Sequence, residues 1–314
     1  MKHTSLNKWI TDFLAQQPLR ANSLVVTVYG DAIAPHGGSV WLGSLIKLMQ
    51  PFGVNARMLR TSVFRLAREE WLESEQIGRR SFYGLTPIGL RRIEHATHRI
   101  YDEHTENWQG GWNLVIVGEA DLDKNRRENL RHELAWQGFG QVAPGVFARP
   151  DSDVKTLREI LADANSTDKV VVMQAKSLGS DYDKPLLRMV HQCWNLGEVV
   201  ADYQVFLQRF VPLLRALKKN ACPDAQQCFL TRTLMIHEYR RVMLRDPQLP
   251  ARLLPRRWPG ARARELAKQI YRLTHAGAER HLMAILESQR GNLPKAAKYY
   301  FQRFGGLEEA GRGE

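Results

Sequence analysis

Three features are scarce or missing in this 314-residue sequence, and each argues against a class of protein. There are only three cysteines (Cys193, Cys222 and Cys228), and none belongs to a Cys-x-x-Cys pair, so neither a disulfide framework nor a zinc site is expected. The apolar run nearest the N-terminus, Leu24–Val28, is far too short to span a bilayer. Residues 1–17 are polar and lack the apolar core of a signal peptide. We therefore expect a cytoplasmic protein with reduced thiols and no membrane partner.

Lysine is absent between Leu48 and Asp123, whereas arginine is abundant there. The whole chain carries a net charge of +12, which favours an anionic partner: nucleic acid, a phosphorylated ligand or a membrane surface. The planar guanidinium of arginine suits guanine edges and phosphates. A GC-rich genome would also exchange lysine for arginine, but it would do so everywhere, and lysines return from Lys124 onward. The distribution therefore favours a nucleic-acid contact in this part of the chain.

Two helices separated by a short turn are predicted between residues 39 and 71. Apolar residues at helical spacing follow Ser39, which we expect to cap the first helix, and Pro51-Phe52-Gly53 ends it. Asn55 can cap a second helix over residues 56–71. A helix, a short turn with glycine and a second helix are typical of the helix-turn-helix motif.

The second helix is predicted to have an apolar face and a basic face. At about 100° per residue, Leu59, Val63 and Leu66 fall on one side. The opposite side forms the candidate DNA-reading surface, which consists of Arg57, Arg60, Thr61, Phe64, Arg65 and Arg68. Acidic residues come only at the helix end, which leaves the N-terminal half positive. A solvated face, the alternative, would mix both signs, so the pattern favours a helix lying in the major groove.

A hairpin with a basic tip follows this helix. Residues 72–77 and 81–85 read as strands, and Gly78-Arg79-Arg80 is the turn between them. Thr86 and Pro87 then begin another helix as N-cap and first residue. A two-stranded wing after a recognition helix places its tip at the backbone or minor groove of the same duplex. We therefore expect a winged helix in which Arg79 and Arg80 contact phosphates or a narrow minor groove.

The middle of the chain alternates short apolar runs with helical patterns. The predicted order is a strand at 112–118, a helix at 122–137, strands at 139–142 and 146–148, a helix at 154–164 and a strand at 169–175. This β-α-β-β-α-β order is that of the ferredoxin-like unit.

Three acidic residues after the first of these strands allow two interpretations. Glu119, Asp121 and Asp123 could hold Mg²⁺ for phosphodiester chemistry, which makes a metal-dependent nuclease the alternative function. The second interpretation is a solvated loop in which Asp121 or Asp123 caps the next helix. We favour the capping loop because nothing downstream supplies an obvious second set of ligands, and we expect no metal site.

From Lys184 the pattern is helical throughout, with helices over 189–217 and 222–244 and a further one from Ala261. A proline-rich crossing, DPQLPARLLPRRWPG, separates the last two. His237, Glu238 and Arg241 lie close together on one helix, and we expect an internal polar network rather than a metal or acid–base site. The sequence contains no G-x-S-x-G, Walker or G-x-G-x-x-G motif, so we expect no catalytic residue and no enzymatic activity.

Several segments, in chain order, resemble the PaaX family of transcriptional repressors of phenylacetic-acid catabolism: HGGSVWLGSL, RMLRTSVFRLAREEWL, GRRSFYGLT, LAWQGFGQVAPGVFARP, HEYRRVMLRDPQLP, RRWPG and YYFQRFGG. The resemblance is thinnest before residue 20 and between about residues 275 and 294. It implies an α+β protein with three domains: a winged-helix DNA-binding domain (20–105), a ferredoxin-like domain similar to Cas2 (109–180) and a helical C-terminal domain (183–314).

The resemblance also implies a homodimer that binds double-stranded operator DNA and is released by phenylacetyl-CoA, with no cofactor. The recognition-helix and wing arginines match the corresponding family segments, whereas no short motif is available for the effector site. An acyl-CoA needs arginines or a helix N-terminus for its anionic arm and an apolar slot for its acyl group. The residues with suitable chemistry are Arg240, Arg241, Arg256, Arg257, Trp258 and Arg262.

Overall fold

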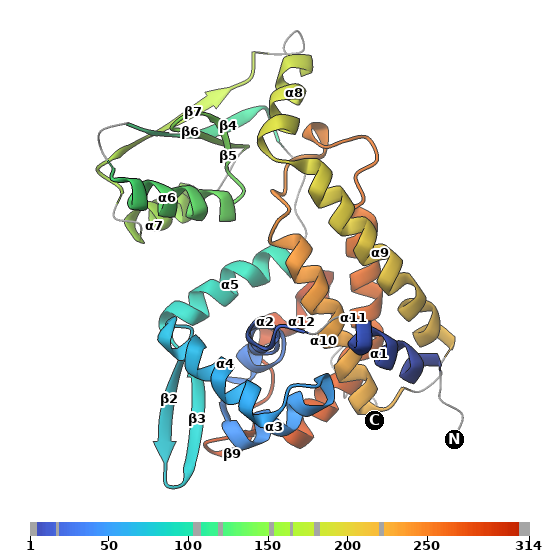
Figure 1. Cartoon of the computed structure of the whole chain (residues 1–314). Helices are drawn as coiled ribbons and strands as arrows, with labels where there is room; N and C mark the ends of the chain where they lie inside the picture. The colour runs from blue at the N-terminus through green and yellow to red at the C-terminus, as the bar shows by residue number, and fades with distance from the viewer. Residues whose placement is uncertain are drawn as a thin grey trace. The chain divides into compact units, whose positions relative to one another are not determined.

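The computed structural model describes residues 5–16, 19–102, 108–118, 122–150, 154–163, 166–178, 183–219 and 223–307 (Figure 1). The chain forms two compact units. Unit 1 consists of Met1–Glu103, Gln204–Met243 and Ala261–Glu314, and unit 2 of His104–Tyr203 and Leu244–Gly260. This division differs from the three expected domains, because residues of the first and third share one unit.

The N-terminal part of unit 1 combines helices with a three-stranded antiparallel sheet of order β1-β3-β2. In chain order its elements are α1 (Ser5–Gln16), α2 (Ala21–Val28), a π-helical turn (Tyr29–Ile33), a 3₁₀ turn (Ala34–His36), β1 (Ser39–Trp41), α3 (Leu42–Met49), a 3₁₀ turn (Gln50–Phe52), α4 (Ala56–Arg68), β2 (Leu72–Ile77), β3 (Arg80–Leu85) and α5 (Pro87–Tyr101). Helix α4 packs against α2, α3 and β2.

The prediction that Ser39 caps a helix was wrong. Residues Ser39–Trp41 form β1, which pairs with Phe82–Gly84 of β3, and the helix begins only at Leu42. Within the first turn of α3, the hydroxyl of Ser44 donates a hydrogen bond to the carbonyl of Trp41, the residue before the helix, at 2.8 Å. A three-residue strand whose partner lies about forty residues later has no local signal in the sequence.

The C-terminal part of unit 1 is built on two long helices, α10 (Ala225–Met243) and α11 (Gly260–Ile285), together with the end of α9 (Leu196–Lys219). Helix α10 packs against α2, and the ring of Phe229 lies 5.8 Å from that of Phe52, so the N-terminal and C-terminal parts share one apolar core. After α11 the chain forms a short hairpin, β8 (Glu287–Ser288) and β9 (Gly291–Asn292), and then α12 (Lys298–Phe301) and a 3₁₀ turn (Arg303–Gly305).

Unit 2 contains a four-stranded antiparallel sheet of order β5-β6-β4-β7. Its elements are β4 (Gly111–Val117), α6 (Lys124–Trp136), β5 (Gly140–Ala143), β6 (Val146–Pro150), α7 (Val154–Asp163) and β7 (Val170–Lys176). Helices α6 and α7 cover one face of the sheet (Figure 1), over a core that includes Val115, Leu134 and Phe147. The predicted β-α-β-β-α-β order is confirmed.

The first of the predicted C-terminal helices is broken into two. Helix α8 (Asp183–Cys193) ends before Asn195, which adopts the left-handed conformation with φ of 44°, and α9 starts at Leu196. The indole of Trp194 donates to the carbonyl of Gly138 at 2.8 Å. This contact holds the break between α8 and α9 against the turn between α6 and β5. Within the described residues, no helix combines the length and apolarity needed to cross a bilayer.

Candidate nucleic-acid interface

Helix α4 has the two faces that the sequence predicts. Asn55 caps it by accepting a hydrogen bond from the amide of Met58 at 2.9 Å, as expected. Leu59, Val63 and Leu66 are buried and hold the helix on the core. The positions of the candidate reading surface are all exposed: Arg57, Arg60, Thr61, Phe64, Arg65 and Arg68. The helix ends at Arg68 rather than at residue 71.

The exposed arginines of α4 differ in whether their guanidinium groups already have a partner. Arg65 donates to Glu69 at 2.7 Å, one turn later, so its guanidinium is partly engaged. Among the described residues, Arg57, Arg60 and Arg68 make no hydrogen bond or ion pair through their guanidinium groups. These arginines keep all their donors available for a ligand.

Phe64 gives the basic face an apolar centre. Its side chain is 64% exposed, a large apolar surface to leave in water beside four arginines. Apolar contact with thymine methyl groups is one of the ways in which proteins read the major groove. The hydroxyl of Thr61 points back along the helix and donates to the carbonyl of Arg57 at 3.1 Å.

The β2–β3 hairpin has a two-residue turn, and its two arginines lie in different environments. Gly78 and Arg79 form the turn, and Gly78 has φ of 59°, which glycine tolerates at the first central position of a tight hairpin turn. Arg80 belongs to β3, opposite Ile77. Its guanidinium lies over the ring of Trp41, 4.4 Å from the centroid, and donates to Glu287 at 2.7 Å.

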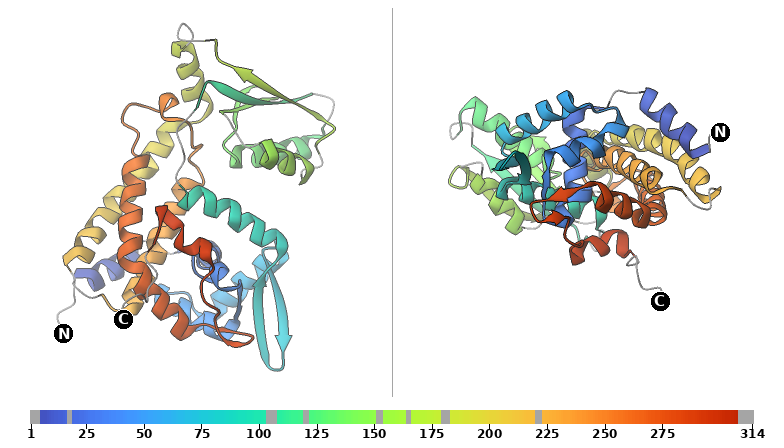
Figure 2. Two further views of the ribbon diagram at one scale, coloured as in Figure 1. Left: turned by 180° about the vertical axis from the view of Figure 1, so that it is seen from behind. Right: turned by 90° about the horizontal axis from the view of Figure 1, so that it is seen from below.

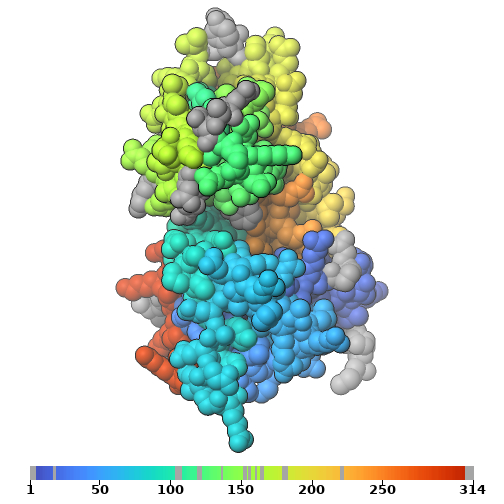
Figure 3. All heavy atoms as spheres, turned by 60° about the vertical axis from the view of Figure 1, so that its left-hand side comes forward, coloured from blue at the N-terminus to red at the C-terminus, as the bar shows by residue number. Residues whose placement is uncertain are grey.

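Arg79 and Arg80 are therefore not an equivalent pair. Both are exposed, but Arg80 is held by a cation–π contact and an ion pair. Arg79 makes no side-chain hydrogen bond or ion pair with any described residue. In Figure 3 the α4 segment and the hairpin are neighbours on one face of the molecule, and the hairpin projects at the foot of the view.

The six effector candidates are divided between the two units. Arg240, Arg241 and Arg262 belong to unit 1, and Arg256, Arg257 and Trp258 to unit 2. Arg240 is partly buried, with its guanidinium 3.5 Å from the Thr27 hydroxyl, and burial lowers its pKa.

The other effector candidates are more open. Arg241 is exposed and pairs with Glu238 at 3.1 Å, while Arg256, Arg257 and Arg262 are exposed. Trp258 is half-buried, and its ring meets that of Tyr203 edge to face at 5.6 Å. Of the six residues, those of unit 2 combine cations with an aromatic surface.

The acidic loop of the middle module contributes a helix cap. Asp123 accepts a hydrogen bond from the amide of Arg126 at 2.9 Å, as the N-cap of α6. Glu119 and Asp121 lie outside the described residues. Among the residues that the structure does describe, no three acidic, histidine or cysteine side chains gather as a metal site would require.

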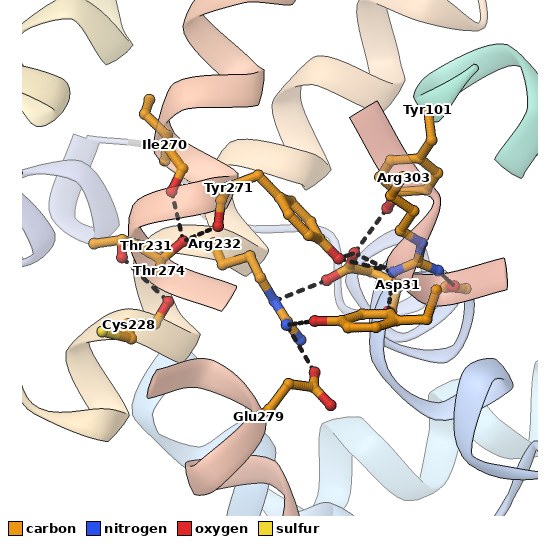
Figure 4. Close-up of polar contacts among 12 residues, drawn as sticks. Asp31, Tyr101, Cys228, Thr231, Arg232, Ile270, Tyr271, Thr274, Glu279 and Arg303 are labelled. Carbon is orange, nitrogen blue, oxygen red and sulfur yellow. Dashed lines mark hydrogen bonds and ion pairs between the residues drawn. The ribbon is translucent and has the colours of Figure 1, made fainter. Parts of the chain in front are cut away.

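A buried ionic network ties the N-terminal part of unit 1 to its C-terminal helices (Figure 4). Asp31, in the π-helical turn, accepts hydrogen bonds from the hydroxyls of Tyr101 at 2.7 Å and Tyr271 at 2.9 Å. Arg232 of α10 approaches the same carboxylate at 3.2 Å, and Arg303 donates to its side chain and its backbone carbonyl. Both guanidinium groups are buried.

Glu279 completes the network from α11. It accepts from Arg232 at 2.8 Å and from His36 at 2.8 Å. Burial alone would raise the pKa of Glu279, but hydrogen bonds from His36 and Arg232 outweigh it and lower the pKa to about 2. The network thus balances one buried and one partly buried carboxylate with two buried guanidinium groups. Sequence reasoning missed it because its members come from segments far apart in the chain.

The predicted polar network around His237 is present with different pairs. The Thr27 hydroxyl donates to the carbonyl of Ser23, so its oxygen accepts from His237 Nδ1 at 3.0 Å. Glu238 pairs with Arg209 and Arg241, both at 3.1 Å. Burial, together with the charges of Arg240 and Arg241, lowers the pKa of His237 to about 3.

His237 should make unit 1 sensitive to acid. Its pKa is about 3 in the folded chain and about 6.5 when unfolded, so unfolding takes up a proton between these values and stability falls as the pH drops below about 6.5. From pH 7 to pH 5 we expect a loss of about 2 kcal/mol from this residue. The variant His237→Asn, which can still donate to Thr27, should lose that much less in denaturant titrations at the two pH values. Equal losses in the two proteins would contradict the assignment.

Three family profiles match the chain in order. They are those of the PaaX-like protein (residues 20–89), the PaaX protein central Cas2-like domain (105–187) and the PaaX-like protein C-terminal domain (194–284). The chain is 38% identical to the transcriptional repressor PaaX of Escherichia coli (strain K12) over 305 residues, 97% of this chain and 96% of the relative. A solved structure of the uncharacterized protein Rv0674 from Mycobacterium tuberculosis matches with 25% identity and a TM-score of 0.49. That match covers 83% of this chain and 96% of the other.

The profile matches agree with the architecture described above. The Cas2-like match covers the β-α-β-β-α-β sheet of unit 2, and the C-terminal match covers the helices α9 to α11. The identity to the repressor extends over nearly the whole of both chains. The chain therefore belongs to the PaaX family.

Proposed function

We propose that this protein is a transcriptional repressor of phenylacetic-acid catabolism genes that binds operator DNA through a winged-helix domain. The observation that supports it best is the outer face of α4, which carries an exposed phenylalanine, Phe64, and three arginines whose guanidinium groups have no partner among the described residues. In this proposal α4 is the recognition helix, and the β2–β3 hairpin is the wing. The Escherichia coli relative is a transcriptional repressor, which agrees with this assignment.

The recognition helix and the wing divide the work of binding. The side chains of α4 reach base edges in the major groove, where arginine makes bidentate contacts with guanine. Arg79, at the tip of the wing, contacts phosphate or a narrow minor groove. Arg80 is a weaker candidate than Arg79 because Glu287 and Trp41 already engage it.

We infer that the protein binds DNA as a homodimer, since a two-fold dimer matches a palindromic operator with half-sites about one helical turn, or a multiple of one, apart. Strand β7 of unit 2 offers one surface for such an interface. It is an edge strand of its sheet, and its side chains Val171, Val172 and Met173 are exposed. An apolar, unpaired edge strand is a ready template for pairing with another chain.

Phenylacetyl-CoA is the proposed inducer, and the unit 2 candidates Arg256 and Arg257 are proposed to hold its anionic arm. An inducer releases DNA only if it binds more tightly to a conformation unable to engage the operator. A near-complete shift requires differential affinity on the order of 5 kcal/mol. The thioester can supply this through its phenyl and CoA parts, whereas free phenylacetate has too few atoms.

Phenylacetyl-CoA should therefore lower the affinity for operator DNA, and phenylacetate should not. The test uses the whole chain, since the N-terminal domain shares its core with α10 and a fragment ending near residue 105 would lose that support. Fluorescence anisotropy with a labelled duplex from upstream of phenylacetate catabolism genes measures the release. The double variant Arg256→Ala, Arg257→Ala should need at least about tenfold more phenylacetyl-CoA.

Arg188→Ala, which removes an exposed arginine of α8, serves as the control for that double variant and should respond as the native protein does. Release by phenylacetate at similar concentrations would contradict the inducer assignment.

A metal-dependent nuclease in the middle module is the alternative function. It is less well supported, because Asp123, one of its three candidate ligands, is used as a helix cap. Incubating the protein with Mg²⁺ and nucleic acid and following cleavage on a gel separates the two functions.

A further inference from the structure

The hairpin β8–β9, which follows the last long helix, is a well-defined element rather than a loose connection. Glu287 pairs with Asn292 and Ser288 with Gly291, which leaves Gln289 and Arg290 as the turn. The hydroxyl of Ser288 lies 3.3 Å and 2.9 Å from the carbonyls of Gly291 and Asn292, and it accepts from the amide of Arg290 at 3.2 Å. One side chain thus organises the whole turn.

This C-terminal hairpin is fastened to the β2–β3 hairpin and its neighbours. Glu287 binds Arg80 through its carboxylate at 2.7 Å and Ser44 through its amide at 3.2 Å. Gln289 donates to Glu75 of β2. Figures 1 and 2 show the two hairpins side by side, with the orange-red β8–β9 loop beside the cyan β2–β3 strands.

The chain after the hairpin is held on the same part of unit 1. The carbonyl of Pro294 lies 2.7 Å from His36 Nδ1, and the amide of Ala297 donates to the carbonyl of Pro35 at 2.9 Å. Leu293, between the hairpin and these contacts, is buried. The position of the hairpin tip is therefore fixed on both sides.

The C-terminal hairpin changes which positive charges are available near the wing. Glu287 forms an ion pair with Arg80, one of the two arginines at the end of the β2–β3 hairpin, and so neutralises its charge. The C-terminal hairpin carries an arginine of its own, Arg290, at its tip. The Arg290 side chain is exposed, and its guanidinium group makes no hydrogen bond or ion pair with any described residue. From Ser288 to Leu307 the sequence contains no acidic residue.

The two tips are close enough to meet one duplex. Gln289, next to Arg290, contacts Glu75, and the wing tip begins three residues further along β2, about 10 Å at the rise of a strand. Successive phosphates of one DNA strand are about 3.4 Å apart along the helix axis. Along a duplex axis a length of about 10 Å spans roughly three phosphates, so both tips can reach the backbone of one strand.

We propose that the β8–β9 hairpin is a second DNA-contacting hairpin, in which Arg290 binds a backbone phosphate of the duplex engaged by Arg79. This rests on the proposed DNA-binding function. It adds to that function a contact from the C-terminal part of the chain, more than 200 residues after the recognition helix.

The test is the salt dependence of binding by the full-length variant Arg290→Ala, measured by anisotropy with an operator duplex and a random duplex. Loss of one phosphate contact should reduce the slope of log K against log salt by about 0.9. At 0.15 M salt the same relation gives an affinity about fivefold lower on both duplexes. Arg290→Lys, which keeps the charge, should retain the native slope.

Two comparisons make the result decisive. Arg215→Ala removes an exposed arginine of α9, in the same unit, and should change neither slope nor affinity. Arg79→Ala should lower the slope as Arg290→Ala does. If Arg79→Ala lowers the slope and Arg290→Ala does not, or if Arg290→Lys behaves like the alanine variant, the second contact is refuted. If the native protein binds no duplex, the proposed function itself fails.

Discussion

Replacing Asp31 with asparagine should lower the free energy of unfolding of unit 1 by about 3–5 kcal/mol. The Asp31 carboxylate lies between the guanidinium groups of Arg232 and Arg303, and all three side chains are buried. Asparagine has the same shape but no charge, so among the described residues Arg232 would keep only the Glu279 carboxylate, and Arg303 would lose its carboxylate partner. Removing one partner of a buried ion pair is costly because the remaining charge stays out of water without compensation.

Hydrogen exchange of backbone amides measures this loss of stability in unit 1 separately from unit 2. In the Asp31→Asn variant the amides of α10 should exchange faster, while those of β4, in unit 2, should keep their native protection and serve as an internal control. A matched surface control is Glu69→Gln, which breaks the exposed pair with Arg65 and should cost less than about 1 kcal/mol. Unchanged protection of α10 in the Asp31 variant would contradict the role assigned to the network.

Replacing Arg57 or Arg60 with alanine should cost about 1–3 kcal/mol of operator binding, roughly a 5- to 150-fold loss, for whichever of the two contacts guanine. Both lie in the N-terminal half of α4, the part of a recognition helix that reaches base edges, and both guanidinium groups are free among the described residues. The loss should be confined to one base position, so that the variant no longer prefers guanine there.

Arg65→Ala is the matched control for this experiment, because Arg65 lies on the same face but is engaged by Glu69. Its replacement should weaken binding less and without regard to sequence. A uniform loss over all operator variants for both Arg57→Ala and Arg60→Ala would reject the base-reading role of α4.

The sequence predicted the helix α4, the β2–β3 hairpin and the caps of α4 and α5 well because their signals are local. The caps Asn55 and Thr86 and the alternation of buried and exposed positions in α4 follow from side chains within a few turns of one another. Each depends on backbone hydrogen bonding or helix periodicity, which a short window of sequence contains. The strands of the Cas2-like module were predicted for the same reason, from short apolar runs bounded by turn residues.

The features that the sequence did not reveal depend on distant partners. Strand β1 exists because Ser39–Trp41 pairs with β3. Arg80 differs from Arg79 because it forms an ion pair with Glu287, which lies 207 residues after Arg80. The left-handed Asn195 breaks a continuous helical pattern where Trp194 docks on Gly138. No periodicity in one segment can show such contacts, and the same holds for the shared core of unit 1.

Methylation interference on a bound operator tests the central claim most directly, because dimethyl sulfate marks guanine N7 in the major groove and adenine N3 in the minor groove. If α4 is the recognition helix, methylated guanines in each half-site should block binding by the native protein. Interference at one of those guanines should disappear in the Arg57→Ala or Arg60→Ala variant. Interference only at adenine N3, or a guanine pattern identical in the native protein and both variants, would contradict the account.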